Sequence, residues 1–175
     1  MPDLENLVTH LIEHGVDFAV VGGFAAVAHG APLVTQDLDV CCEFSVDNLM
    51  RLQAALSDLH PAHRMSPARP PLELTPENCP TFRNLYLDTD HGQLGCLSGI
   101  AGVGAFAEVK RNSVPVRLPA GRCRILSLDA LIRAREALGR PRDRQALLHL
   151  KAIRERLDQQ RPIAAKDQRH GREGS

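Results

Sequence analysis

The sequence predicts an α/β fold, in which helices flank a mixed, mostly antiparallel β-sheet and further helices follow at the C-terminal end. Three observations predict it. Helix-like and strand-like hydrophobic patterns alternate over the first third of the chain. Two pairs of strand-like segments are each joined by a short turn, which is typical of β-hairpins. Beyond residue 127, apolar residues recur at helical spacing in two successive segments.

The first part of the chain is predicted to alternate helix and strand. Leu4, Leu7, Leu11 and Ile12 recur at helical spacing, and Gly15 can end that helix. A short apolar strand, an alanine-rich helix, an alternating strand and a helix capped by Ser45 are expected next. In chain order these elements span residues 17–21, 24–29, 35–42 and 46–59.

Turn-forming residues divide the remainder of the chain. Residues 61–80 hold six of the twelve prolines and are predicted as a long loop, with at most a short helix from near Thr75. Hairpins are expected over 83–97 and 114–125, separated by a glycine-rich loop and a short helix near 105–109. Ser127 can cap a helix through Leu138, and Pro141 suits the first turn of another helix. We expect one domain over residues 1–158 and a disordered polar tail over 159–175.

Composition excludes several classes of protein. Lys and Arg total 21, as do Asp and Glu, so the formal net charge is zero and bulk electrostatic binding of nucleic acid is disfavoured. Few aromatic residues are available to stack on single-stranded bases. No apolar run is long enough for a membrane span, and the acidic, amphipathic N-terminus is unlike a signal peptide. The five cysteines include no CxxC, so we expect buried, reduced thiols in a cytoplasmic protein.

One segment carries residues suited to phosphate chemistry. Gly22-Gly23 lies between a predicted strand and helix, where bare backbone N–H groups can receive a phosphate. Asp37 and Asp39 alternate with apolar residues on the next strand, so both carboxylates lie on one face and can share Mg²⁺ or Mn²⁺. Each half has a simpler explanation, a tight turn and a solvated strand edge respectively. Their combination in strand, Gly-Gly, helix, strand order favours a metal–nucleotide site.

These residues resemble the signature of the nucleotidyltransferase superfamily, which has the fold of DNA polymerase beta. Later segments are similar to the minimal bacterial branch related to the AbiEii-type toxin nucleotidyltransferases. Three separated blocks carry the resemblance in the same order, and it covers residues 4–155. The blocks are Val20–Gly23 with Asp37–Asp39, Gly92–Leu97 with Gly102–Gly104, and Ser127–Arg135 with Gly139–Asp143.

The resemblance implies a minimal nucleotidyltransferase core that moves a nucleoside monophosphate from an NTP to a hydroxyl or phosphate acceptor. The acceptor would be a tRNA, a protein or a small molecule such as an aminoglycoside, and a cognate antitoxin protein is an implied partner. Catalysis and metal binding would fall to Asp37 and Asp39. Nucleotide binding would fall to Gly22, Gly23, Thr35, Arg135, Arg140 and Asp143.

Some of these roles have equally good structural alternatives. The hydroxyl of Thr35 could merely begin the strand, and Arg140 with Asp143 could form a structural cap pair. The basic residues between 133 and 156 could receive an RNA acceptor, but the solvated face of two helices is the favoured interpretation because aromatic residues are absent there.

Two positions depart from the family pattern. Gly95 occupies the place of the third carboxylate, which in the superfamily helps to hold the catalytic metal. Arg135 stands where the family usually has Lys; it still neutralises phosphate but with a different geometry. Gly95 leaves three outcomes open: another carboxylate substitutes, water fills the shell and the reaction is slow, or the chain is a degenerate member that binds nucleotide or a partner without catalysis. A coincidental pattern in a metal-free structural protein is disfavoured by the agreement of three blocks.

Overall fold

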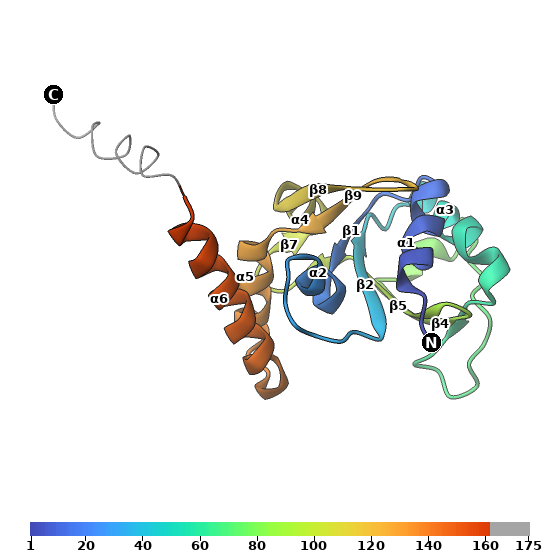
Figure 1. Ribbon diagram of the computed structural model, residues 1–175. Helices are drawn as coiled ribbons and strands as arrows, with labels where there is room; N and C mark the ends of the chain where they lie inside the picture. Colours follow the sequence, from blue (N-terminus) through green and yellow to red (C-terminus); the bar gives the residue numbers. More distant parts are fainter. Residues whose placement is uncertain (162–175) are drawn as a thin grey trace, which may run out of the picture.

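A computed structural model describes residues 1–161 and shows a seven-stranded sheet flanked by helices (Figure 1). The strand order is β3-β4-β5-β2-β1-β9-β8, and β6 and β7 form a separate two-stranded ribbon. The strands are β1 Phe18–Val21, β2 Asp37–Cys42, β3 Ala62–His63, β4 Asn84–Thr89, β5 Gly92–Leu97, β6 Gly99–Ile100, β7 Gly104–Ala105, β8 Ser113–Leu118 and β9 Gly121–Leu126. The helices are α1 Leu4–Glu13, α2 Gly22–Ala28, α3 Val46–Leu56, α4 Phe106–Arg111, α5 Leu128–Leu138 and α6 Arg144–Gln159.

The sheet is mixed and mostly antiparallel, as predicted. Strand β2 pairs antiparallel with β1 and parallel with β5, and β1 also pairs parallel with β9. The two predicted hairpins, β4–β5 and β8–β9, complete the sheet on either side. Strand β2 therefore lies at the centre of the sheet. Its two neighbours are β1, which precedes it in the chain, and β5, which lies about fifty residues after it. This position makes β2 the strand on which the rest of the site is built.

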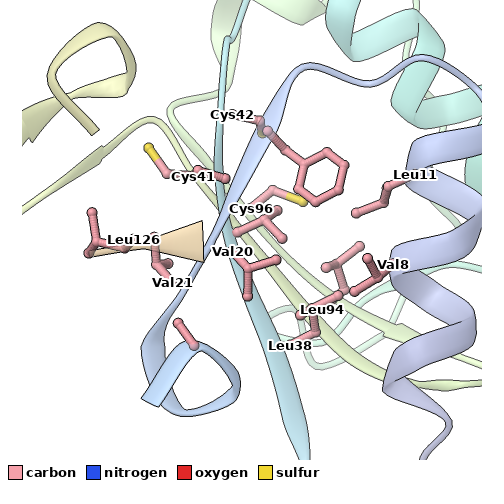
Figure 2. Packing of buried hydrophobic residues seen from close by; sticks show 14 of the residues in the cluster. Val8, Leu11, Val20, Val21, Leu38, Cys41, Cys42, Leu94, Cys96 and Leu126 are labelled. Atoms are coloured by element: carbon pink, nitrogen blue, oxygen red, sulfur yellow. The ribbon is translucent and has the colours of Figure 1, made fainter. Parts of the chain in front are cut away.

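Two apolar layers cover the faces of the sheet. Figure 2 shows Val8 and Leu11 of α1 beside Leu38 on one face, whereas Val21 and Cys41 point to the other face. Helices α1 and α3 cover the first face, and α2 and α5 contact each other on the second (Figure 1). Because successive strand residues alternate between faces, the burial of Leu38 and Val40 directs the side chains between them to the second face.

The predicted helix ends are confirmed by hydrogen bonds. Ser45 Oγ accepts from the backbone N–H of Asn48 at 3.2 Å, and Ser127 Oγ accepts from that of Ala130 at 3.2 Å. Gly139 ends α5 in a left-handed conformation with φ of 59°. The chain then passes through a short 3₁₀ turn, Pro141–Asp143, before α6 begins. These local signals are why the chain reverses direction between α5 and α6.

Short elements that the sequence analysis did not predict lie within its predicted loops. Ala62–His63 pairs with β4 as an edge strand, and β6 pairs with β7 inside the glycine-rich loop. Two-residue strands carry too little periodicity to be recognised from sequence. The 61–80 loop contains a 3₁₀ turn, Cys79–Thr81, a few residues beyond the helix start suggested at Thr75. Of the predicted 159–175 tail, Gln159 is the last residue of α6, and residues 162–175 lie outside the described part of the chain.

The cysteine prediction is confirmed: all five thiols are buried and none is in a disulfide. Burial, together with the neighbouring Cys42 and Glu43, raises the pKa of Cys41 to about 12, so its thiol stays protonated. Across the described residues, no helix has the length and apolar character needed to cross a membrane.

Candidate active site

A cleft of about 620 Å³ opens on the second face of the sheet, over the central strand β2. It brings together residues that are far apart in the sequence. Its polar and glycine lining is formed by Gly22, Gly23, Asp37, Asp39, Arg64, Asn84, Tyr86, Gly99, Arg135, Arg140 and Arg142. Apolar residues of β1, β5, β9 and α5 form the remaining walls. Most of the residues predicted to act on nucleotide therefore line one cleft.

The two carboxylates of β2 both line this cleft. Asp37 and Asp39 are half-buried, and Leu38 between them is fully buried on the opposite face. A strand with period two must direct both aspartates to the same side when the intervening residue packs in the core. The period-two prediction is thus confirmed for the orientation of this pair.

The carboxylate of Asp39 lies between Gly95 on the neighbouring strand β5 and Gly22, the first residue of α2. A β-carbon at Gly22 would lie 2.9 Å from Asp39 Oδ2, and one at Gly95 would lie 2.4 Å from Asp39 Oδ1. Gly22 also has φ of 66°, a left-handed conformation that favours glycine. Gly95 pairs directly with Asp39 in the β2–β5 register, so position 95 faces the same cleft. Both glycines are thus needed for the observed position of this carboxylate.

Burial and charge together perturb Asp39. Burial, and secondly the negative charge of Asp37, raise the pKa of Asp39 from 3.8 to about 6. The positive charges of Arg64 and Arg140 act in the opposite direction. Such a carboxyl is easily neutralised when no cation is bound, and a divalent cation would favour its ionised form.

One wall of the cleft carries a clamp made of two arginines and a buried aspartate. Arg135 Nη1 donates to Asp143 Oδ1 at 2.8 Å, and Arg140 Nε donates to Asp143 Oδ2 at 2.5 Å. Asp143 is 7% exposed and does not line the cleft, whereas both arginines do. The structure therefore places Asp143 behind the arginines, where it fixes their positions. The ion pair considered for Arg140 and Asp143 exists and also includes Arg135, but neither Arg140 nor Asp143 caps a helix through a side-chain hydrogen bond.

Thr35, like Asp143, is a predicted nucleotide-binding residue that does not line this cleft. Its hydroxyl donates to the backbone oxygen of Asp37 at 2.9 Å, and it lines a different, largely apolar pocket beside Phe24 and Val34. A β-carbon at Gly23 would lie 3.1 Å from Thr35 Oγ1, so Thr35 packs behind the Gly-Gly segment. Its observed contacts hold the start of β2 in place.

The opposite wall holds residues that the sequence analysis missed. Arg64 follows the edge strand β3, and Asn84 and Tyr86 lie on β4. The polar residues of β4 alternate with the buried Leu85 and Leu87, and this pattern could have indicated a polar face. No comparable signal marks Arg64, because the segment that holds it follows no periodic pattern. Only the pairing of β3 with β4 brings it to the cleft.

Two basic residues of the C-terminal helices form exposed ion pairs. Lys151 Nζ lies 3.0 Å from Glu136 Oε1, and Arg154 Nη1 lies 3.3 Å from Asp129 Oδ1. These contacts link α5 and α6 at the surface. They agree with the interpretation of this run as a solvated helix face for these two residues, whereas Arg135, Arg140 and Arg142 of the same run line the cleft.

The donor set is suited to a magnesium ion that arrives with phosphates. Magnesium commonly takes one or two protein carboxylates and completes its shell with water and substrate oxygens. Asp37 and Asp39 supply two carboxylates on one face of β2. Within residues 1–161, no group of three or more His, Cys, Asp or Glu side chains is placed to hold a metal ion. The residues therefore fit a nucleotide-borne Mg²⁺ rather than a site made by protein ligands alone.

Comparison with known proteins shows the fold. No family model matches the chain, and no curated protein matches its sequence. The solution structure of the antibiotic-resistance factor ANT(2'')-Ia is similar, with a TM-score of 0.51 and 14% identity over 95% of this chain and 94% of that chain. This likeness, with the mixed sheet and its flanking helices, shows that the chain has a nucleotidyltransferase fold.

Two further structures have weaker similarity. The crystal structure of ANT(2'')-Ia in complex with adenylyl-2''-tobramycin gives a TM-score of 0.47, with 14% identity over 88% of this chain and 96% of that chain. A nucleotidyltransferase candidate from Thermotoga maritima gives 0.49, with 15% identity over 91% of this chain and 97% of that chain.

Proposed function

We propose that this chain is a magnesium-dependent nucleotidyltransferase that moves a nucleoside monophosphate from an NTP to a hydroxyl or phosphate acceptor. One observation carries the proposal: within a nucleotidyltransferase fold, a single cleft combines the Asp37–Asp39 pair with arginines beside Gly22-Gly23. Carboxylates for a cation and guanidinium groups for phosphates are the groups that phosphoryl transfer needs.

The sheet order supports a triphosphate position on the β1 side of Asp39. Strand β1, the Gly-Gly segment and α5 all lie on the same side of β2, and the Arg135–Arg140 clamp belongs to that side. Because Asp143 holds both guanidinium groups, little side-chain entropy is lost when they bind phosphate. Mg²⁺, when bound by Asp37 and Asp39, would neutralise phosphate charge and polarise the transferred phosphoryl group.

The reaction conserves atoms and charge in one displacement. The acceptor oxygen attacks the α-phosphorus and forms a new O–P bond, while the bond from that phosphorus to the bridging oxygen of the β-phosphate breaks. Pyrophosphate leaves with the electron pair, and the proton of a hydroxyl acceptor passes to solvent water. The arginines stabilise the charge that accumulates on the transferred and leaving groups.

The finer assignment to the AbiEii-type branch rests on the three sequence blocks. It leaves a tRNA, a protein or a small molecule such as an aminoglycoside as the acceptor, and it proposes a cognate antitoxin as partner. An NTP substrate and five unbonded cysteines support a cytoplasmic location. In the same way, the sequence pattern supports one nucleotidyltransferase-like domain over residues 1–158.

A second candidate function is nucleotide binding without catalysis, and Gly95 is the observation that favours it. Glycine there leaves two carboxylates where the resemblance implies three. Pyrophosphate release by the wild type, measured with Mg²⁺, an NTP and an acceptor pool, distinguishes the two candidates. Release above that of the Asp37→Ala/Asp39→Ala variant would favour the transferase, whereas nucleotide binding without release would favour the non-catalytic member.

Calorimetry tests the proposed function directly. Each NTP is titrated with Mg²⁺ into the wild type, the Asp37→Ala/Asp39→Ala variant and an Asp129→Ala control, whose aspartate is 67% exposed and outside the cleft. We expect binding that the double variant loses and the control keeps. Binding of no NTP by the wild type, with either Mg²⁺ or Mn²⁺, would refute the proposal.

A further inference from the structure

The wall of the cleft formed by β4 and the end of β3 carries a guanidinium group that the proposed nucleotide site does not use. Arg64 lines the cleft there together with Asn84 and Tyr86. In the sheet order, β5 and β4 lie on the side of β2 opposite to β1. If the triphosphate lies toward β1 and α5, the acceptor must approach Asp39 from the Arg64 side.

Three contacts, one with Gln93 and two with Tyr86, fix the position of Arg64. Its Nη1 donates to Gln93 Oε1 at 2.8 Å, and its guanidinium carbon lies 5.6 Å from the centre of the Tyr86 ring. Its backbone N–H donates to the carbonyl of Tyr86 at 3.0 Å. These contacts anchor the residue to β4 and β5, so the guanidinium group is held in place before any ligand binds.

Arg64 keeps unused binding capacity. Its Nε is buried and has no hydrogen-bond partner, and within residues 1–161 it forms no ion pair. A buried donor without a partner costs free energy, and Arg135 Nε, in the wall proposed for the triphosphate, is in the same state. The neighbouring cleft carboxylates, Asp37 and Asp39, are the pair proposed to hold the cation. The Arg64 guanidinium group lines the cleft without a carboxylate partner among the described residues, so it is suited to an oxyanion brought by a ligand.

We infer that Arg64 binds a phosphate or carboxylate group of the acceptor, so the acceptor substrate is an anionic compound with a reactive hydroxyl nearby. This inference rests on the proposed function for the direction of approach. A polycationic acceptor is disfavoured, because Arg64, Arg140 and Arg142 all line the cleft and would repel it. The geometry thus restricts the acceptor class that the sequence left open.

The test uses a resonance that reports on this one group. The Nε–H signal of Arg64, assigned by its loss in Arg64→Gln, is followed by NMR while the full chain is titrated. Mg²⁺ and a non-hydrolysable α,β-methylene NTP first saturate the nucleotide site. Inorganic phosphate and acetate are then the two probes, and spermidine is the cationic comparison. We expect an oxyanion to shift the signal and spermidine to leave it unchanged.

Matched variants separate binding from folding. We expect Arg64→Gln to weaken binding of the effective probe about tenfold or more and Arg64→Lys to retain part of it. Arg69 lies on the same loop as Arg64, pairs with Asp88 of β4 and does not line the cleft. Arg69→Gln should therefore leave probe binding unchanged. Affinity for the Mg²⁺–NTP analogue, measured at about pH 8 where Asp39 is ionised, should stay within about twofold in all three variants, which also verifies that each is folded.

The outcomes distinguish the two oxyanion sources and the two proposals. A shift with phosphate alone supports a phosphorylated acceptor, and a shift with acetate alone supports a carboxylate acceptor. No shift with either probe, or equal probe binding by Arg64→Gln, would overturn the inference. If the protein binds a probe at Arg64 but binds no NTP, the oxyanion site is supported and the proposed function is refuted. NTP binding with no effect at Arg64 would remove this inference alone.

Discussion

The carboxylate of Asp39 lies over the α-carbon of Gly95 on the adjacent parallel strand, so close that a β-carbon at position 95 would come within 2.4 Å of Oδ1. The Asp39 carboxylate occupies the space that a side chain at position 95 would need. The absence of a third carboxylate at position 95 and the observed position of the Asp39 carboxylate therefore depend on each other. Any variant at this position changes the placement of the proposed metal ligand.

Gly95→Ala should disturb the site and leave the fold intact. The group that must move is the end of a flexible side chain, so we expect little change in melting temperature. Displacement of the Asp39 carboxylate should weaken Mg²⁺–NTP binding about tenfold, as measured by calorimetry. In an Asp39→Ala background the same change should have no further effect. An equal loss of Mg²⁺–NTP affinity in both backgrounds would show that the contact with Asp39 is not its cause.

Gly22→Ala and Gly15→Ala form a matched pair. Both glycines have left-handed φ, 66° and 68°, but only a β-carbon at Gly22 would contact Asp39. We expect each variant to lower the free energy of unfolding by about 1–2 kcal/mol, since alanine is strained in this conformation. Only Gly22→Ala should also weaken Mg²⁺–NTP binding. Denaturant unfolding and calorimetry measure the two effects, and similar NTP affinities in the pair would refute this explanation.

Asp143→Asn should reduce stability through the two arginines that it holds. Removing the charge leaves Arg135 and Arg140 without their carboxylate in a half-buried site, at a cost of about 3 kcal/mol. The control, Asp129→Asn, breaks an exposed pair with Arg154 and should cost less than about 1 kcal/mol. Thermal unfolding compares them. Asp143→Asn should also weaken NTP binding, and normal affinity with lower stability would restrict the clamp to a structural role.

Nucleotide binding should depend on pH through Asp39. Metal binding requires the ionised carboxylate, and the pKa of this group is raised to about 6. Mg²⁺–NTP affinity should therefore be constant above about pH 7 and fall about tenfold per unit below pH 6. Arg64→Gln removes a charge that lowers this pKa, so the midpoint should move upward. A midpoint near 4 would show that Asp39 is not the titrating group.

Stability should show the complementary effect. Because the folded pKa of Asp39, about 6, exceeds the unfolded value of 3.8, folding favours the protonated form, and the unfavourable contribution of Asp39 develops between these two pH values and is complete above pH 6. Asp39→Asn should thus stabilise the protein near pH 8 and have little effect near pH 4. Denaturant unfolding at the two pH values checks the sign, and equal effects at both would contradict it.

Local patterns along the chain were enough to predict most helices and strands, the helix caps and the orientation of the aspartate pair. The alternation of Asp37, Leu38 and Asp39 is a property of neighbouring residues, so it needs no knowledge of the remaining fold. The same holds for Ser127 and Gly139, which delimit α5 through local hydrogen bonds. Two-residue strands and the environments of single side chains have no such local signal.

Contacts between distant segments decided the character of the site. Pairing of β2 with β5 put Gly95 under Asp39, and pairing of β3 with β4 brought Arg64 to the cleft from a loop without periodicity. The turn that follows α5 brings Asp143 back against this helix, where Asp143 is buried behind Arg135 and Arg140. Local sequence could name the carboxylates and suggest the Arg140–Asp143 pair, but the burial of Asp39 and its approach to Arg64 and Arg140 depend on segments far away in sequence.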